Sequence, residues 1–184
     1  MEFKTTIFFA LSVLGFVSTA ASATITGTSS VSATFNTTIE AGTCSAQVQD
    51  ASGSPTSQIS FGDVFKSDLA NKTREEAFKI AFTGCAGVRS AAIRATTGAG
   101  GSCSSASSLN FGANNNTAFE LWNGDSATGT QLSCKSPQTE TVTISSGTAT
   151  YNLSSRIVVA DGKTVADVAT GSVTSPVTFL VTYQ

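Results

Sequence analysis

The clearest structural signal in the sequence is Val177-Thr178-Phe179-Leu180-Val181-Thr182-Tyr183. An apolar side chain occupies every second position from Val177 to Tyr183, with threonine on both outer intervening positions. Successive side chains of a β-strand point to opposite faces, so this period of two predicts a strand with one apolar face. Termini usually fray, and an apolar strand that runs to the penultimate residue is therefore unusual. The last strand of an ordinary sandwich would show the same alternation.

The rest of the chain predicts further strands that are separated by turns. Runs of β-branched and aromatic residues, which favour strands, occur at 31–39, 78–82, 118–122, 141–144 and 156–159. Turn signals lie between them at Asn123-Gly124, Ser146-Gly147 and Asp161-Gly162. The stretch 67–77 predicts one short helix, of a turn or two. Many short strands with frequent turns predict an all-β sandwich.

Composition excludes several classes of function. The 184 residues suggest one domain, the net charge is −2, and no block of basic residues is present. We therefore expect no nucleic-acid partner, since nothing in the chain attracts phosphates electrostatically. The chain has no histidine and no Cys-x-x-Cys motif, which argues against a zinc site, a redox motif or a histidine base. We expect neither a cofactor nor an enzymatic activity.

The first residues predict a signal peptide. Lys4 precedes an apolar run at 7–17, and small residues follow, ending Ala21-Ser22-Ala23. The apolar run is shorter than the roughly 20 residues that span a membrane, which disfavours an anchor. We expect cleavage after Ala23 and export to an oxidising compartment, where disulfides form. The four cysteines, Cys44, Cys85, Cys103 and Cys134, allow three connectivities.

The segment that follows the predicted cleavage site, 24–34, has no charge and alternates like a strand. Its residues that would share one side are Ile25, Gly27, Ser29, Val31 and Ala33. By itself, an uncharged terminal tail of this kind is usually disordered. Gly27 marks either a close approach to another backbone or a simple turn.

Four features together resemble the pilins of the chaperone–usher family, such as the type 1 pilus subunits. The first two are the signal peptide with its uncharged extension and the pair formed by Cys44 and Cys85, the latter in Phe82-Thr-Gly-Cys85. The third is Ile59-Ser-Phe61-Gly-Asp-Val64, which is similar to the family's segment after the first strand. The fourth is the C-terminal pattern of Gly171, alternating apolar residues and the penultimate Tyr183.

The resemblance implies an incomplete immunoglobulin-like β-sandwich that lacks its last strand and is completed by a donor strand from a neighbouring subunit. The implied division of the chain is a signal peptide at 1–23, a donor-strand extension at 24–34 and a pilin domain at 35–184. The implied partners are a periplasmic pilus chaperone, an outer-membrane usher and other pilins, in an extracellular fimbria that supports cell adhesion. Chaperone recognition and the groove would involve Gly171, Val177, Phe179, Val181, Tyr183 and Gln184.

The resemblance also implies a disulfide between Cys44 and Cys85. Cys103 and Cys134 depart from the general family pattern, and we expect them to form a second disulfide. One alternative function is a minor or tip-associated subunit that binds a host glycan, with a surface site at Trp122 and Asn114-Asn115-Asn116. Another alternative is a secreted immunoglobulin-like domain that does not polymerise.

Overall fold

A computed structural model describes residues 34, 36–37 and 42–184. Strands make up most of the regular structure, so the fold is all-β, as the sequence predicted. The elements in chain order are β1 (Thr43–Asp50), α1 (Lys66–Asn71), β2 (Glu75–Ala86), β3 (Ser90–Thr97), β4 (Phe111–Gly112), β5 (Thr117–Asn123), β6 (Thr130–Leu132), β7 (Thr139–Thr143), β8 (Ala149–Val159), the short 3₁₀-helix η1 (Val165–Asp167) and β9 (Val177–Tyr183).

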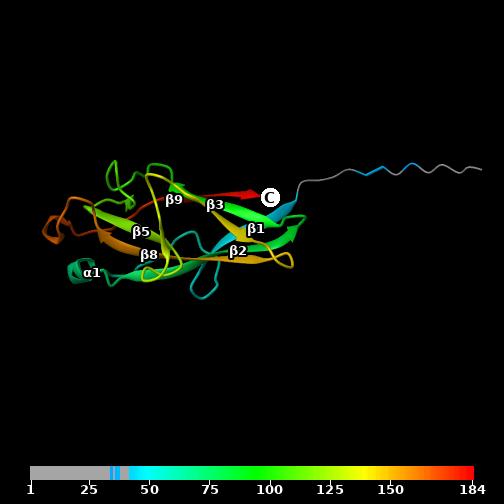
Figure 1. Ribbon diagram of the computed structural model, residues 1–184. Helices are drawn as coiled ribbons and strands as arrows, with labels where there is room; N and C mark the ends of the chain where they lie inside the picture. The colour runs from blue at the N-terminus through cyan, green and yellow to red at the C-terminus, as the bar shows by residue number, and fades with distance from the viewer. Residues whose placement is uncertain (1–33, 35, 38–41) are drawn as a thin grey trace, which may run out of the picture. The chain divides into compact units, whose positions relative to one another are not determined.

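The strands form two antiparallel sheets. The larger sheet has the order β1-β2-β8-β5-β4, with β6 paired to β5, and the smaller sheet has the order β7-β3-β9. Figure 1 shows β3 and β9 in one layer and β2, β5 and β8 in the other, with α1 beyond one end of the sheets. This arrangement is the two-layer sandwich expected from the sequence pattern.

The core lies between the two sheets. From the larger sheet, β2 contributes the nearly inaccessible side chains of Phe78, Ile80 and Phe82. From the smaller sheet, β3 contributes alternate residues, among them Ile93, to the same cluster. Burying a large apolar side chain stabilises a fold by about 1.5–3 kcal/mol, so these two strands supply much of the driving force for folding.

Five of the strand predictions can be compared with the described residues. The expected strand at 177–183 has the bounds of β9, while the others lie within or overlap β2, β5, β7 and β8. The predicted strand at 31–39 falls mostly outside the described residues. β8 begins at Ala149, well before the predicted 156–159, because its residues from Ala149 onward pair with β2. Pairing with neighbours on both sides therefore extends a strand beyond its apolar run.

Four strands were missed by the sequence pattern, namely the very short β4 and β6 and the longer β1 and β3. β1 reads TCSAQVQD and β3 reads SAAIRATT, both poor in the large β-branched and aromatic residues that favour strands. Packing decides the structure of β3, which lies between β7 and β9 and buries Ala91 and Ala95 almost completely, while Ala92 is only partly buried. The predicted helix is present but short, because Lys72 adopts a left-handed conformation with φ of 53° and ends it.

Candidate functional site

The last strand, β9, lies at an edge of the smaller sheet. It runs antiparallel to β3, with Tyr183 opposite Ala91, Val181 opposite Ile93 and Phe179 opposite Ala95. Among the strands that the structure describes, β9 pairs with β3 alone. The other side of an edge strand presents N–H and C=O groups that can pair with another strand.

The core is open to solvent along this edge. The core-facing residues of β9 are only partly buried, and they are Val177, Phe179, Val181 and Tyr183. The β3 partners of Tyr183, Val181 and Phe179 are buried, with Ala91 at 0%, Ile93 at 2% and Ala95 at 4% exposure. Two adjacent strands thus send apolar side chains to the same core, yet only the inner strand has them covered. An additional strand beside β9 would cover the rest.

Aromatic contacts hold β9 against the opposite sheet. The ring centroid of Phe179 lies 6.2 Å from that of Phe78, and the ring of Tyr183 lies 6.5 Å from that of Phe82. Both pairs are tilted or edge-on, which are the favoured arrangements of aromatic rings. The open edge is therefore a fixed part of the sandwich rather than a loosely attached strand.

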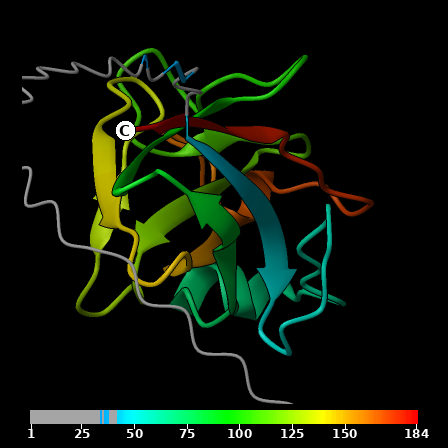
Figure 2. The same cartoon turned by 90° about the vertical axis from the view of Figure 1, so that its right-hand side faces the viewer.

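A second edge strand, β1, begins close to the end of β9. The N–H groups of Arg89 and Ser90 donate to the carbonyl of Gln184 at 2.8 and 3.1 Å. Gly42 lies just before β1 and packs tightly on the turn between β2 and β3. A Cβ at Gly42 would lie 2.7 Å from the side chain of Val88 in that turn. Figures 1 and 2 both show the beginning of β1 beside the end of β9. The partly buried side chain of Val48 on β1 packs on the same core as the β9 residues.

The structure contains two disulfides, Cys44–Cys85 and Cys103–Cys134, and has no free cysteine. The first joins β1 to β2, so it fastens the edge strand β1 to the larger sheet. The second joins the connection between β3 and β4 to the segment that follows β6. Both pairings are those expected in the sequence analysis.

The other predicted site residues fall into two groups. Gly171 lies in the connection before β9 and not on the strand itself; its φ is +132° and it packs against Asn115. The proposed donor residues Ile25, Gly27, Ser29, Val31 and Ala33 lie outside the described residues.

The residues considered for a surface glycan site are occupied by contacts within the chain. Trp122 is half-buried, and the guanidinium carbon of Arg156 lies 5.7 Å from its ring centroid. The side-chain amides of Asn114, Asn115 and Asn116 donate hydrogen bonds to the connection that leads to β9. Neither feature supports a site for a glycan.

A paired group of charges lies on the face of the larger sheet that points away from the core. Glu120, only 5% exposed, accepts hydrogen bonds from Lys72 at 3.1 Å and from Arg156 at 2.8 Å. Glu75 accepts a hydrogen bond from the backbone N–H of Ser126 at 3.0 Å. Burial raises the pKa of Glu75, but the Ser126 hydrogen bonds and the Arg156 charge outweigh it and hold the pKa below its usual value.

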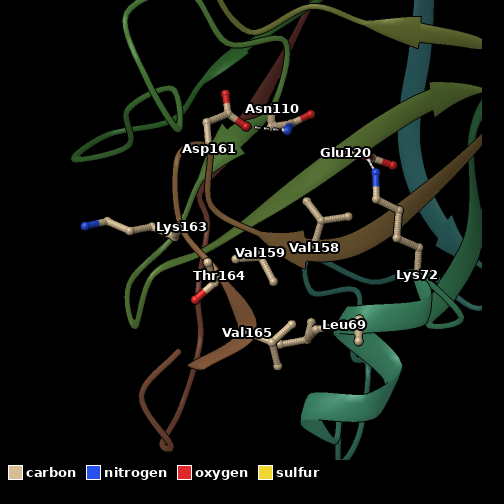
Figure 3. A pocket seen from close by; sticks show the side chains of 11 residues that line it. Leu69, Lys72, Asn110, Glu120, Val158, Val159, Asp161, Lys163, Thr164 and Val165 are labelled. Atoms are coloured by element: carbon tan, nitrogen blue, oxygen red, sulfur yellow. Dashed lines mark hydrogen bonds and ion pairs between the residues drawn. The ribbon is translucent and has the colours of Figure 1, made fainter. Parts of the chain in front are cut away.

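Sequence reasoning missed a cavity of about 300 Å³ between α1 and the connection from β8 to η1. Figure 3 shows its apolar residues Leu69, Val158 and Val165 and two polar pairs on its rim. The pairs are Lys72 with Glu120 at 3.1 Å and Asn110 with Asp161 at 3.0 Å. Since these residues come from distant parts of the chain, only the strand pairing could have revealed the cavity.

Neither a membrane helix nor a metal cluster was found in the described part of the chain. No helix there has the length and hydropathy that crossing a bilayer requires. Among the same described residues, no three histidine, cysteine or acidic side chains gather where they could hold an ion.

Comparison with known proteins identifies the family. No protein-family model matches the chain. Over 174 residues the chain is 37% identical to the uncharacterized fimbrial-like protein YadL of Escherichia coli strain K12, covering 85% of this chain and 86% of YadL. This degree of identity and coverage places the two proteins in one family.

Solved pilus structures have the same fold. The P pilus rod subunit PapA matches with a TM-score of 0.57 and 18% identity, over 77% of this chain and 99% of PapA. A second match is a chain in a chaperone–usher pilus structure that addresses the molecular basis of rod uncoiling. It also has a TM-score of 0.57 and 18% identity, over 85% of this chain and 96% of its own length. The sandwich is therefore the immunoglobulin-like fold of pilins.

The chain belongs to the family of fimbrial-like proteins that includes YadL, and it has the fold of chaperone–usher pilus subunits, as the sequence resemblance implied. This membership and the shared fold support a role as a structural subunit of a fimbria.

Proposed function

We propose that this subunit polymerises by strand addition, in which the edge of β9 accepts the extended segment 24–34 of a neighbouring copy or another pilin. The observation that carries the proposal is the partial exposure of four alternating core residues on an edge strand. A strand that pairs with β9 satisfies its backbone groups and places every second side chain over the open core.

The favourable free energy of hydrogen bonding and apolar burial in such an insertion is similar in size to the unfavourable free energy of ordering the inserted segment. Each backbone hydrogen bond contributes about 1 kcal/mol net, and full burial of Ile25 or Val31 contributes about 1.5–3 kcal/mol. Ordering a flexible segment costs about 1–2 kcal/mol per residue. The balance therefore depends on the apolar surface of the acceptor that becomes covered, namely the exposed parts of Val177, Phe179, Val181 and Tyr183.

The same edge requires a partner before the fibre forms, because an unpaired apolar edge promotes aggregation. We propose that the signal peptide at 1–23 directs export, and that a periplasmic chaperone then pairs with β9. An outer-membrane usher exchanges the chaperone for the segment 24–34 of the next subunit, and the domain at 35–184 forms the body of the fibre. The subunit acts as a building element and not as an enzyme.

Substitutions on the two sides of the donor segment test the proposal. Val31→Asp places a charge where an apolar side chain should enter the core, and a buried charge without a partner is strongly unfavourable. Ser32→Asp places the same charge on the opposite side of the segment and is the matched control. Electron microscopy should show fimbriae with the control and none with Val31→Asp. Fibres of normal length from Val31→Asp would contradict strand addition by this segment.

A further inference from the structure

The connection between η1 and β9 is held by a run of three asparagines in the turn between β4 and β5. The side-chain amide of Asn114 donates to the carbonyl of Ser172 at 2.7 Å, and its oxygen accepts from the N–H of Thr174 at 2.9 Å. Asn115 also donates to Ser172, at 3.1 Å. These side chains bind the backbone of a segment that belongs to neither sheet.

Two further contacts extend this asparagine clamp, which we define as Asn114–Asn116. The amide of Asn116 donates to the carbonyl of Asp167 at 2.8 Å, and the N–H of Ala169 donates to the carbonyl of Asn115 at 3.2 Å. The clamp therefore contacts the connection at several points between Asp167 and Thr174, immediately before β9.

The backbone of the clamp explains why asparagine stands there. Asn115 and Asn116 have φ values of +60° and +59°, in the left-handed region. Asparagine tolerates this region better than most residues with a side chain, and it also carries the amide donor. Gly171 fits beside the clamp, since a Cβ there would lie 3.3 Å from the side-chain nitrogen of Asn115.

We propose that the asparagine clamp positions β9 for strand addition. This inference rests on the proposed function, because it concerns the same acceptor edge. Among the described strands, β9 has a sheet partner on one side only, so its first residues would fray without a second attachment. The clamp, whose last contact is at Thr174, supplies this attachment together with two hydrogen bonds of 2.8 Å, one from the Gly98 N–H to the Pro176 carbonyl and one from the Ser175 hydroxyl to the Gly112 carbonyl. An acceptor that is already ordered binds faster and more tightly, since less ordering accompanies binding.

Asn114→Ala is the direct test because it removes two of the hydrogen bonds. The matched control is Asn152→Ala, an exposed asparagine on β8 for which the structure records no side-chain hydrogen bond among the described residues. Asn115→Gly is the milder variant, because glycine accepts a φ of +60° and only the side-chain bond is lost.

The experiment uses the full chain and a fluorescent synthetic peptide of residues 24–34. Fluorescence anisotropy gives the association rate, and hydrogen exchange measured by mass spectrometry reports on 168–183. Asn114→Ala should bind the peptide about thirtyfold more slowly than wild type, the factor that corresponds to two hydrogen bonds of about 1 kcal/mol each. Its exchange at 168–176 should be faster, Asn115→Gly should be intermediate, and Asn152→Ala should match wild type.

The possible failures are distinguishable. If the wild-type chain does not bind the peptide, strand addition itself is overturned. If wild type binds the peptide and both clamp variants bind it as fast as wild type, the positioning role alone is overturned. A variant with faster exchange at 168–176 but an unchanged association rate would also overturn it, because the clamp would then serve stability only. If Asn114→Ala does not fold, Asn115→Gly decides between these outcomes.

Discussion

The ring of Tyr183 meets the ring of Phe82 edge-on, with 6.5 Å between ring centroids and 88° between the ring planes. Tyr183 is the last residue of β9, and Phe82 is one of the least exposed side chains in the core. The contact connects the open edge of the smaller sheet to the centre of the larger one. A substitution at Tyr183 should therefore alter both the proposed acceptor surface and the stability of the subunit.

Tyr183→Ala should lower the free energy of unfolding by about 2 kcal/mol. This value is below the 3–5 kcal/mol of a fully buried aromatic, because Tyr183 is only partly covered. Tyr183→Phe keeps the ring and should stay near wild type. Chemical denaturation of the full chain measures both. Equal stability of the alanine and phenylalanine variants would show that the ring contact contributes nothing.

Substitutions on the two faces of β9 should have opposite outcomes. Val181→Asp places a charge on the core-facing side and should abolish fibres and reduce the amount of soluble subunit. Leu180→Asp, on a side chain that is 54% exposed, should preserve both. Immunoblots of periplasmic extracts and microscopy of the cells measure these effects. Loss of fibres with Leu180→Asp but not with Val181→Asp would contradict an acceptor surface on the core-facing side of β9.

Peptide mapping under non-reducing conditions should recover Cys44 linked to Cys85 and Cys103 linked to Cys134. A peptide that links Cys44 to Cys103 would contradict the structure. Replacing Cys44 and Cys85 together by serine should lower the free energy of unfolding by about 2–5 kcal/mol, as removal of a native disulfide does in small exported domains. The comparison is with the oxidised wild-type subunit.

Acid should destabilise the subunit partly through Glu75. Its pKa in the folded state lies below the usual value of 4.5, so the stabilisation is complete above that pH and is lost as the pH falls through the lower, folded-state pKa. Glu75→Gln should therefore show a weaker loss of stability below about pH 4.5. Ser126→Ala, which removes the side-chain donor to Glu75, should reduce the dependence in the same direction. Denaturation midpoints at pH 7 and in acid measure it; identical pH profiles for wild type and Glu75→Gln would contradict this role.

The local and compositional features of this protein could be predicted from its amino-acid sequence. The alternation from Val177 to Tyr183 predicted β9 with its observed bounds, since period two is a property of the strand backbone. The cysteine pair and the order of the motifs were enough to indicate the family. The uncharged alternation at 24–34 still rests on sequence alone, because those donor residues lie outside the described residues.

The site depends on which strands are neighbours, and this became known only from the three-dimensional packing of the chain. Alternation identifies the core-facing side of β9, but it does not show that no other described strand pairs with its outer edge; this follows from the position of β9 outside β3. The alanines of β3 became a strand through burial between two neighbours, and Asn114–Asn116 became a clamp through bonds to residues more than fifty positions away. Such contacts join distant segments, whereas sequence periodicity records only the local geometry of the backbone.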